Sequence, residues 1–231
     1  MTTPELRIQA DEARLAGRRS RALTLAQVAT RFIGHPSPWL MAALFVAATT
    51  ARVLAGDWRP SDAWLPPLMV AAFPFFEWTV HTAILHWRPK RLGRFTIDPL
   101  LARSHRDHHA DPRNVPLVFI PWRALLWVLT AFTGIGLLAF PRLALGLTFL
   151  VVVGALGLCY EWTHFLIHSD YRPRSAIYRK IWRNHRLHHY RNEHYWFTVT
   201  TAGTADRILG TYPDPQSVAP SPTAKALHST A

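Results

Sequence analysis

The chain has 231 residues, 49% of them hydrophobic, and a formal net charge of +12. Such a length suits one domain with a short tail. Apolar and basic residues in these proportions must be segregated, as in a membrane protein with basic loops on one side. A nucleic-acid-binding protein is disfavoured because the basic residues lie between apolar runs rather than along one face. The single cysteine, Cys159, excludes a disulfide framework and a thiolate metal site.

Residues 1–36 form a basic N-terminal segment in which leucines alternate with arginines. This pattern is compatible with a solvated helix or with a basic amphipathic helix that lies on the membrane surface. Pro36 and Pro38 are expected to break the helix. The segment precedes a predicted membrane domain that covers residues 37–212.

The first two apolar segments of this domain, residues 39–51 and 64–76, are short for a span of about 20 residues. We expect the first to lengthen if Arg52 extends its charged end to water. The second reaches the required length if its helix continues to Trp87.

Two further apolar segments, residues 124–140 and 143–160, contain no charged side chain. Pro141 and Arg142 between them leave room only for a tight hairpin. The sequence therefore predicts an all-α fold, an integral-membrane four-helix bundle of two hairpins. We expect a helical cap on this bundle to carry a dinuclear, histidine-rich metal site, which the histidine clusters described below indicate.

Basic residues flank the predicted spans unevenly. Most lie before the first span, within residues 88–113 or after His168, while Arg52, Arg59 and Arg142 lie on the other side. The positive-inside rule then places both termini, the middle loop and the site in the cytoplasm. We expect an integral protein of a bacterial inner membrane or an equivalent membrane.

The last segment, residues 213–231, is rich in Pro, Ser, Ala and Thr. It has no apolar period that could define a buried face. This composition predicts a disordered tail.

Ten of the thirteen histidines fall in four short clusters. Two clusters place histidines at i, i+3 and i+4 on one helix face, and a third places them at i and i+4. His81 and His86 are five apart, about 140° around an ideal helix. They converge on one metal only if the helix is distorted; otherwise they serve two metals, or His86 sits where the helix loosens ahead of Pro89. The predicted metal ligands are His81, His86, His105, His108, His109, His164, His168, His185, His188 and His189.

Ten imidazoles exceed what one ion uses, so two ions are the economical interpretation. Imidazole suits zinc, copper, nickel and iron alike.

His164 lies roughly 32 Å along a helix from Leu143, just beyond a hydrocarbon core of about 30 Å. A histidine-rich site at a lipid boundary fits oxidation of apolar substrates by a redox metal. A metal transporter would instead place its ligands within the spans, and a haem carrier would use histidine pairs inside the bundle.

Three carboxylates lie close to these histidines in the sequence, namely Glu77, Glu161 and Asp107. A metal-bound imidazole commonly donates its other N–H to such a group, and we expect these residues to accept it. The alternative is that Glu77 and Glu161 mark the water boundary of their spans. His194 is expected to be an outer donor rather than a primary ligand, and His35 and His228 look incidental.

The four clusters in order resemble the fatty acid hydroxylase / sterol desaturase superfamily of integral-membrane di-iron oxygenases. Its pattern is His-x4-His, His-x2-His-His, His-x3-His and His-x2-His-His, and the likeness runs from about Phe75 to Gly210. The stretch from Asp206 to Thr211 also resembles the usual close of the family after the last cluster.

The resemblance implies a dioxygen-dependent lipid hydroxylase with two iron ions, whose place zinc can take in purified protein. Its oxidised centre would remove hydrogen from a C–H bond and return a hydroxyl group. A membrane lipid, with a fatty acyl chain foremost, would be the substrate, and a separate electron-transfer protein would supply electrons. A sterol desaturase or oxidase and a carotenoid hydroxylase remain alternatives, and no nucleic acid is implied.

Overall fold

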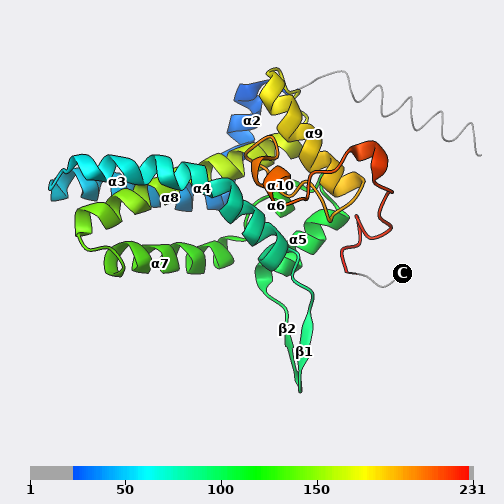
Figure 1. The fold of residues 1–231 in the computed structure, drawn as a ribbon, viewed down its shortest axis with the longest axis horizontal. Helices are drawn as coiled ribbons and strands as arrows, with labels where there is room; N and C mark the ends of the chain where they lie inside the picture. The colour runs from blue at the N-terminus through cyan, green and yellow to red at the C-terminus, as the bar shows by residue number, and fades with distance from the viewer. Residues whose placement is uncertain (1–22, 229–231) are drawn as a thin grey trace, which may run out of the picture.

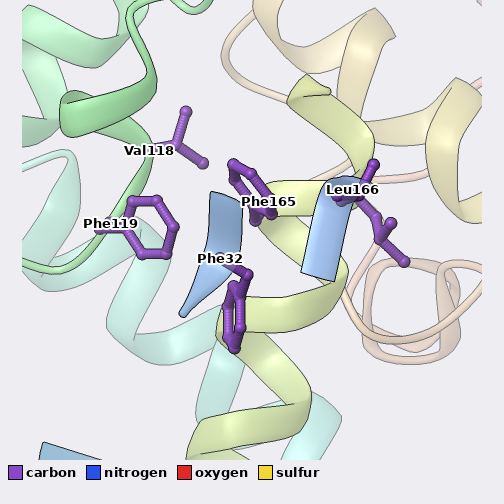
Figure 2. Close-up of a cluster of buried hydrophobic side chains, with 6 residues drawn as sticks. Phe32, Val118, Phe119, Phe165 and Leu166 are labelled. Atoms are coloured by element: carbon purple, nitrogen blue, oxygen red, sulfur yellow. The ribbon is translucent and has the colours of Figure 1, made fainter. Parts of the chain in front are cut away.

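The computed structural model describes residues 23–228. Its first helix, α2 (Leu25–Phe32), begins at a capping box in which Thr24 and Gln27 exchange hydrogen bonds. Val28 and Phe32 are buried against the end of α8 (Leu143–His168), together with Phe119 and Phe165 (Figure 2). Residues 1–22 lie outside the described residues. The part of the N-terminal segment that is described packs on protein through its apolar face.

Four helical segments are long and apolar enough to cross a membrane. They correspond to the four spans that the sequence predicts, although the second ends at Leu85 rather than Trp87 and the third runs from Val115 to Leu138. The elements within them are α3 (Pro36–Ala55), η1 (Pro60–Trp64), α4 (Leu65–Val80), η2 (His81–Leu85), α6 (Val115–Val118), α7 (Trp122–Leu138) and α8. The spans themselves are Pro36–Ala55, Pro60–Leu85, Val115–Leu138 and Leu143–His168.

Helix α8 is the centre of this bundle. It contacts α3, α4 and α7, whereas α3 and α4 make few contacts with each other among the described residues (Figure 1). Gly154 allows α3 close to α8, since a Cβ atom there would lie only 2.9 Å from the Cα of Phe45. Small residues commonly permit such approaches in membranes. The arrangement is therefore better described as three spans around α8 than as two separate hairpins.

Charged residues at the end of the bundle where α8 begins are paired with one another. Arg52 is 3% exposed, lies 3.3 Å from Asp62 and donates to the hydroxyl of Thr148 at 2.9 Å. Arg142 pairs with Asp62 and also with Asp57, the latter at 2.8 Å. The expectation that Arg52 extends to water is wrong, because the carboxylate of Asp62, in η1 beyond the turn that follows α3, compensates its burial.

Short elements gather at the opposite end, where α8 ends (Figure 1). They are α5 (Leu100–Ala110), α9 (Ala176–Tyr190), α10 (Thr204–Ile208) and η3 (Pro215–Ser217). A hairpin of β1 (Lys90–Leu92) and β2 (Phe95–Ile97) projects from this end. The all-α prediction omitted it, because each strand has only three residues. Gly93, at φ +58°, supplies the left-handed conformation that the two-residue turn requires.

Residues 213–228, called the C-terminal strap below, are packed onto this end of the protein. Val218, Ala224 and Leu227 are buried. Arg191 donates to the carbonyl of Val218 at 2.9 Å and accepts from the backbone N–H of Ser221 at 2.7 Å. The expectation of a disordered tail is thus wrong for residues 213–228. Three scattered apolar side chains and backbone hydrogen bonds order the segment, and neither is visible in its composition.

Candidate metal centre

The ten predicted ligands converge into two groups of five where α8 ends. Within each group, one ring nitrogen from every histidine lies within 4.8 Å of the others. Most of these side chains are buried, and only His86 and His168 are partly exposed. The first group comprises His81, His86, His105, His109 and His188, and the second comprises His108, His164, His168, His185 and His189.

The histidine segments of α5 (His105–His109) and α9 (His185–His189) each contribute to both groups. On α5, the i and i+4 residues His105 and His109 belong to the first group, while His108 belongs to the second. Helix α9 has the reverse assignment, and its His188 belongs to the first group. A shared helix face therefore does not mean a shared group. The mixed membership ties the two groups into one unit.

A local widening of the second span brings His81 and His86 together. Residues His81–Leu85 form a π-helical turn, and the N–H of His86 donates to the carbonyl of His81 at 3.0 Å. Such a turn places residues five apart on one face, and π-turns are frequent at functional sites. Of the arrangements that the sequence left open, the distorted helix is the one observed. Both side chains belong to the first group.

Backbone carbonyl groups set the orientation of four imidazoles. Because a carbonyl oxygen can only accept, the Nδ1 atom facing it must carry the proton, and Nε2 is left with a lone pair. The contacts are His81 with Phe197 at 2.6 Å, His109 with Ala224 at 2.9 Å, His164 with Val118 at 2.9 Å and His188 with Tyr195 at 2.8 Å. Each carbonyl thereby directs a lone pair toward its group.

The Nε2 atoms crowd together in a way that a bound cation explains. The Nε2 atom of His105 lies 3.1 Å from those of both His81 and His109, each of which presents a lone pair. A single proton on His105 can satisfy only one of them. In the second group, the Nε2 atoms of His168 and His189 each lie 3.0 Å from that of His185.

Further ring nitrogens in both groups are buried without a partner among the described residues, including Nε2 of His86, His164 and His188. Buried polar atoms are normally satisfied. Converging imidazole nitrogens form a suitable donor set for iron, zinc, copper or nickel. The residues present therefore fit two metal ions, one in each group.

Burial keeps the imidazoles of α5 and α9 neutral. Desolvation lowers the pKa of His109 to about 4. It also lowers the pKa of the other histidines on these helices well below the usual value, and neighbouring imidazoles add to the effect (His105, His108, His185, His188 and His189). A neutral imidazole is the form that binds a metal. These nitrogens are consequently available at neutral pH without first losing a proton.

Glu77 occupies a different place from the one expected. Its carboxylate accepts hydrogen bonds from the N–H groups of Val199 at 2.5 Å and Thr200 at 3.0 Å, and from the hydroxyl of Thr200 at 2.7 Å. This loop also presents the carbonyl of Phe197 to His81. Glu77 thus holds the segment that orients a histidine, and a backbone carbonyl takes the place expected for the carboxylate.

Asp206, in the stretch that resembles the close of the family, holds the same loop from the other side. Its buried carboxylate accepts from the N–H groups of Phe197 at 2.8 Å and Thr198 at 2.9 Å. It also accepts from the hydroxyl of Thr211 at 2.7 Å, and that hydroxyl accepts from the indole of Trp78 at 2.9 Å. The stretch therefore fastens the loop to the second span.

Glu161 repeats this role in the second group. Its carboxylate accepts from the N–H of Ile120 at 3.0 Å, next to the segment whose Val118 carbonyl faces His164. Asp107, in contrast, has an exposed side chain on α5. The expectation that these carboxylates contact imidazoles directly is replaced by an indirect role for the two glutamates.

Glu193 has the same role for the strap, and the sequence reasoning did not single it out. Its carboxylate accepts from the hydroxyls of Ser221 at 3.0 Å and Thr223 at 2.5 Å. The next residue, Ala224, offers its carbonyl to His109. The only sequence signal was an acidic residue four positions after the last histidine cluster.

The remaining histidines lie outside both groups. The side chain of His194 is 57% exposed, and its Nε2 lies 3.6 Å from the carboxylate of Glu193. Its exclusion from the primary ligands stays a prediction. His35 stacks on Phe119 with ring centroids 3.9 Å apart. His228 is not incidental, because its Nε2 donates to the carbonyl of His86 at 2.8 Å.

A cavity of about 460 Å³ opens beside the second group. His168 is part of its wall, and the aromatic residues Trp182 and Tyr190 line it together with Arg113 and Arg186. The guanidinium of Arg186 lies over the rings of Trp182 and Tyr190, at 4.6 and 5.0 Å from their centroids. The second group thus borders an opening lined by both aromatic and cationic side chains.

Residues 66–211 match the profile of the fatty acid hydroxylase family. The chain belongs to the fatty acid hydroxylase family. The family is metal-dependent, and its members are membrane-bound oxidoreductases, in agreement with the four apolar spans and the histidine groups. The resemblance noted from the four histidine clusters is confirmed. The strap, residues 213–228, lies beyond the matched region.

The fold is also similar to that of a solved structure, described as full-length Scs7p with only the hydroxylase domain visible. The two share 19% sequence identity with a TM-score of 0.65, over 79% of this chain and 67% of the other. At this identity the likeness establishes the fold alone. None of the curated proteins compared matches the chain significantly.

Proposed function

We propose that this fatty acid hydroxylase family member uses two iron ions, one in each histidine group, to hydroxylate a membrane lipid. The observation that carries the proposal is the pair of five-histidine groups, in which carbonyl contacts leave lone pairs pointing inward. Iron is favoured over the other imidazole-binding metals because the proposed reaction is a redox reaction. The ten histidines named above would be the ligands.

When bound, the iron ions would supply the redox chemistry that uses dioxygen. In the overall reaction a C–H bond becomes C–OH, and the second oxygen atom leaves as water with two electrons and two protons. The electrons would come from a separate electron-transfer protein. The chain itself would position the imidazoles through its backbone carbonyls and exclude bulk water from the reacting carbon through burial of the groups.

The apolar substrate would reach the site from the bilayer. Large hydrophobic side chains are exposed along the spans, as expected of surfaces that face lipid, and α4 and α8 both end at the histidines. A fatty acyl chain is the substrate class that the family match favours.

We also infer that the histidine end faces the cytoplasm, because most basic residues flank it. Reporter fusions after Pro60 and Ala231 should then lie on opposite sides of the membrane.

The test is lipid profiling of cells that express the wild-type chain or His185→Ala under isotopically labelled dioxygen. The proposal expects hydroxylated acyl chains that carry the label only with the wild-type chain. A labelled sterol or carotenoid product would replace the substrate assignment while keeping the reaction. Unlabelled hydroxyl groups, or profiles that do not differ between the two chains, would overturn the proposed reaction.

A further inference from the structure

The β1–β2 hairpin is exposed on both of its faces. In the register Lys90 with Ile97, Arg91 with Thr96 and Leu92 with Phe95, the described side chains of both strands are all exposed. A single two-stranded hairpin is only marginally stable in water. The pairing of these two strands alone therefore does not explain why the hairpin stays extended here.

One face of the hairpin is mostly apolar and the other is polar. Directly paired residues share a face and successive residues alternate, so Leu92, Phe95 and Ile97 lie on the same side, together with Lys90 at its edge. They are 67%, 63% and 44% exposed. Arg91 and Thr96 occupy the opposite side. Three large apolar side chains gathered on an exposed face indicate an interaction surface.

The charge of the segment narrows the choice of partner. Residues 88–97 include four basic side chains and no acidic one. The ammonium group of Lys90 lies 4.5 Å from the ring centroid of Trp87. Basic residues interleaved with aromatic and aliphatic ones are typical of segments that bind an anionic lipid surface.

The position of the hairpin places a membrane within reach. The second span ends at Leu85, and β1 begins at Lys90, only five residues later. Figure 1 shows the hairpin running across the direction of the bundle helices and extending past the side on which α7 lies. With the bundle helices taken to cross the bilayer, a hairpin with this direction runs parallel to the membrane plane, and its first strand begins five residues beyond the end of the span.

The base of the hairpin is fixed to the histidine-bearing helix α5. Arg106 donates to both carboxylate oxygens of Asp98 at 2.8 and 2.6 Å, and to the carbonyl of Trp87 at 3.2 Å. The indole of Trp87 in turn donates to the carbonyl of Ile97 at 3.3 Å. The hairpin is consequently a rigid extension of α5 and not a free loop.

We propose that the β1–β2 hairpin lies in the headgroup layer of the membrane. Its Leu92, Phe95 and Ile97 face the acyl chains, and its basic side chains contact anionic headgroups. Because Arg106 joins the hairpin to α5, this contact sets the height of the histidine groups above the bilayer.

The test uses nitroxide labels on the full chain in lipid nanodiscs that contain an anionic phospholipid. In a Cys159→Ser background, Phe95→Cys and Thr96→Cys place labels on adjacent residues of opposite faces. The label at position 95 should collide more often with oxygen than with a water-soluble nickel chelate, and the label at 96 should show the reverse. Equal access of the chelate to both labels, or spin–spin broadening that reveals a second copy, would overturn the proposal.

The role of charge is tested in the same system with Lys90, Arg91 and Arg94 replaced by Gln. In the labelled Phe95→Cys protein that keeps its basic residues, the label at position 95 should lie deeper in anionic than in neutral nanodiscs. The triple replacement should abolish this difference. If the difference persists, the anionic-headgroup contact is refuted. Metal content measured on each variant verifies that the protein is folded.

Discussion

The two histidine groups are assembled by the same rule, yet they depend on different parts of the chain. Each takes one pair from a long helix, an i, i+4 pair from a short helix and a fifth histidine from the other short helix. In the second group, the carbonyl that orients His164 belongs to Val118 of α6. In the first group, the orienting carbonyls come from Tyr195, Phe197 and Ala224, all beyond α9.

This difference separates a group held by the bundle from one held by the C-terminal part of the chain. The first group is covered by the strap through Ala224 and His228, whereas the second borders the cavity at His168. The two groups should therefore respond differently to changes in distant segments, although their histidines are equivalent in number and type.

The largest effect is expected from removing the one histidine that each short helix gives to the group of the other, namely His188 of α9 and His108 of α5. His188→Ala should lower metal occupancy of the first group and His108→Ala that of the second, and both should abolish turnover, because each removes an imidazole from a group of five. Metal analysis and Mössbauer spectra of iron-loaded protein would identify the affected group. Full activity in either variant would remove that histidine from the site.

Removal of the strap should lower the metal affinity of the first group and leave that of the second unchanged. A chain that ends at Tyr212 loses the carbonyl contact to His109 and the contact of His228. Outer contacts of this kind typically change metal affinity by about 10- to 100-fold. We expect such a loss in the first group only, measured by metal titration. A chain that lacks only residues 229–231 is the control, and an equal loss from both groups would contradict the comparison.

The two buried glutamates offer a smaller, matched perturbation. Glu77→Gln weakens the attachment of the loop that orients His81, and Glu161→Gln weakens that of the segment that orients His164. Hydrogen bonds to a charged group contribute about 1.5–3 kcal/mol each, so both variants should melt at lower temperature. Spectra of the iron-loaded variants should change in the first group for Glu77→Gln and in the second for Glu161→Gln. Identical spectral changes would show that the loops do not act separately.

The smallest effect is expected for His194→Ala. Because this side chain is exposed and lies outside both groups, the variant should keep its full metal content. Activity should fall by no more than the roughly 10- to 100-fold typical of outer positions. Loss of one ion per chain would place His194 among the ligands.

Much of this molecule could be predicted because its strongest signals are local. Four apolar runs indicated four spans, and the histidine spacing identified all ten members of the two groups. Their division into groups was not predictable, because His108 and His188 share helix faces with histidines of the other group. That assignment depends on how α5 and α9 cross, which is a property of packing.

The supports of the site were the least visible in the sequence. A backbone carbonyl is the same in every residue, so nothing marks Phe197, Val118 or Ala224 as a partner of an imidazole. The composition of the strap resembled a disordered tail, although a few buried side chains and Glu193 keep it in place. Arg52 was expected to reach water because its acidic partner, Asp62, lies across a turn in another helix.

The π-turn of η2 has a consequence for the relation between the two long helices. Counted from the first histidine to the second, the second span has one residue more than α8, with His81 and His86 against His164 and His168. In a regular helix an extra residue turns everything beyond it by about 100°. Here the widened turn absorbs that rotation within five residues. Deleting one residue between His81 and His86 would thus convert the π-turn into an ordinary α-helical turn. The two histidines would then be four residues apart, as His164 and His168 are on α8, and both imidazoles would stay on the same face.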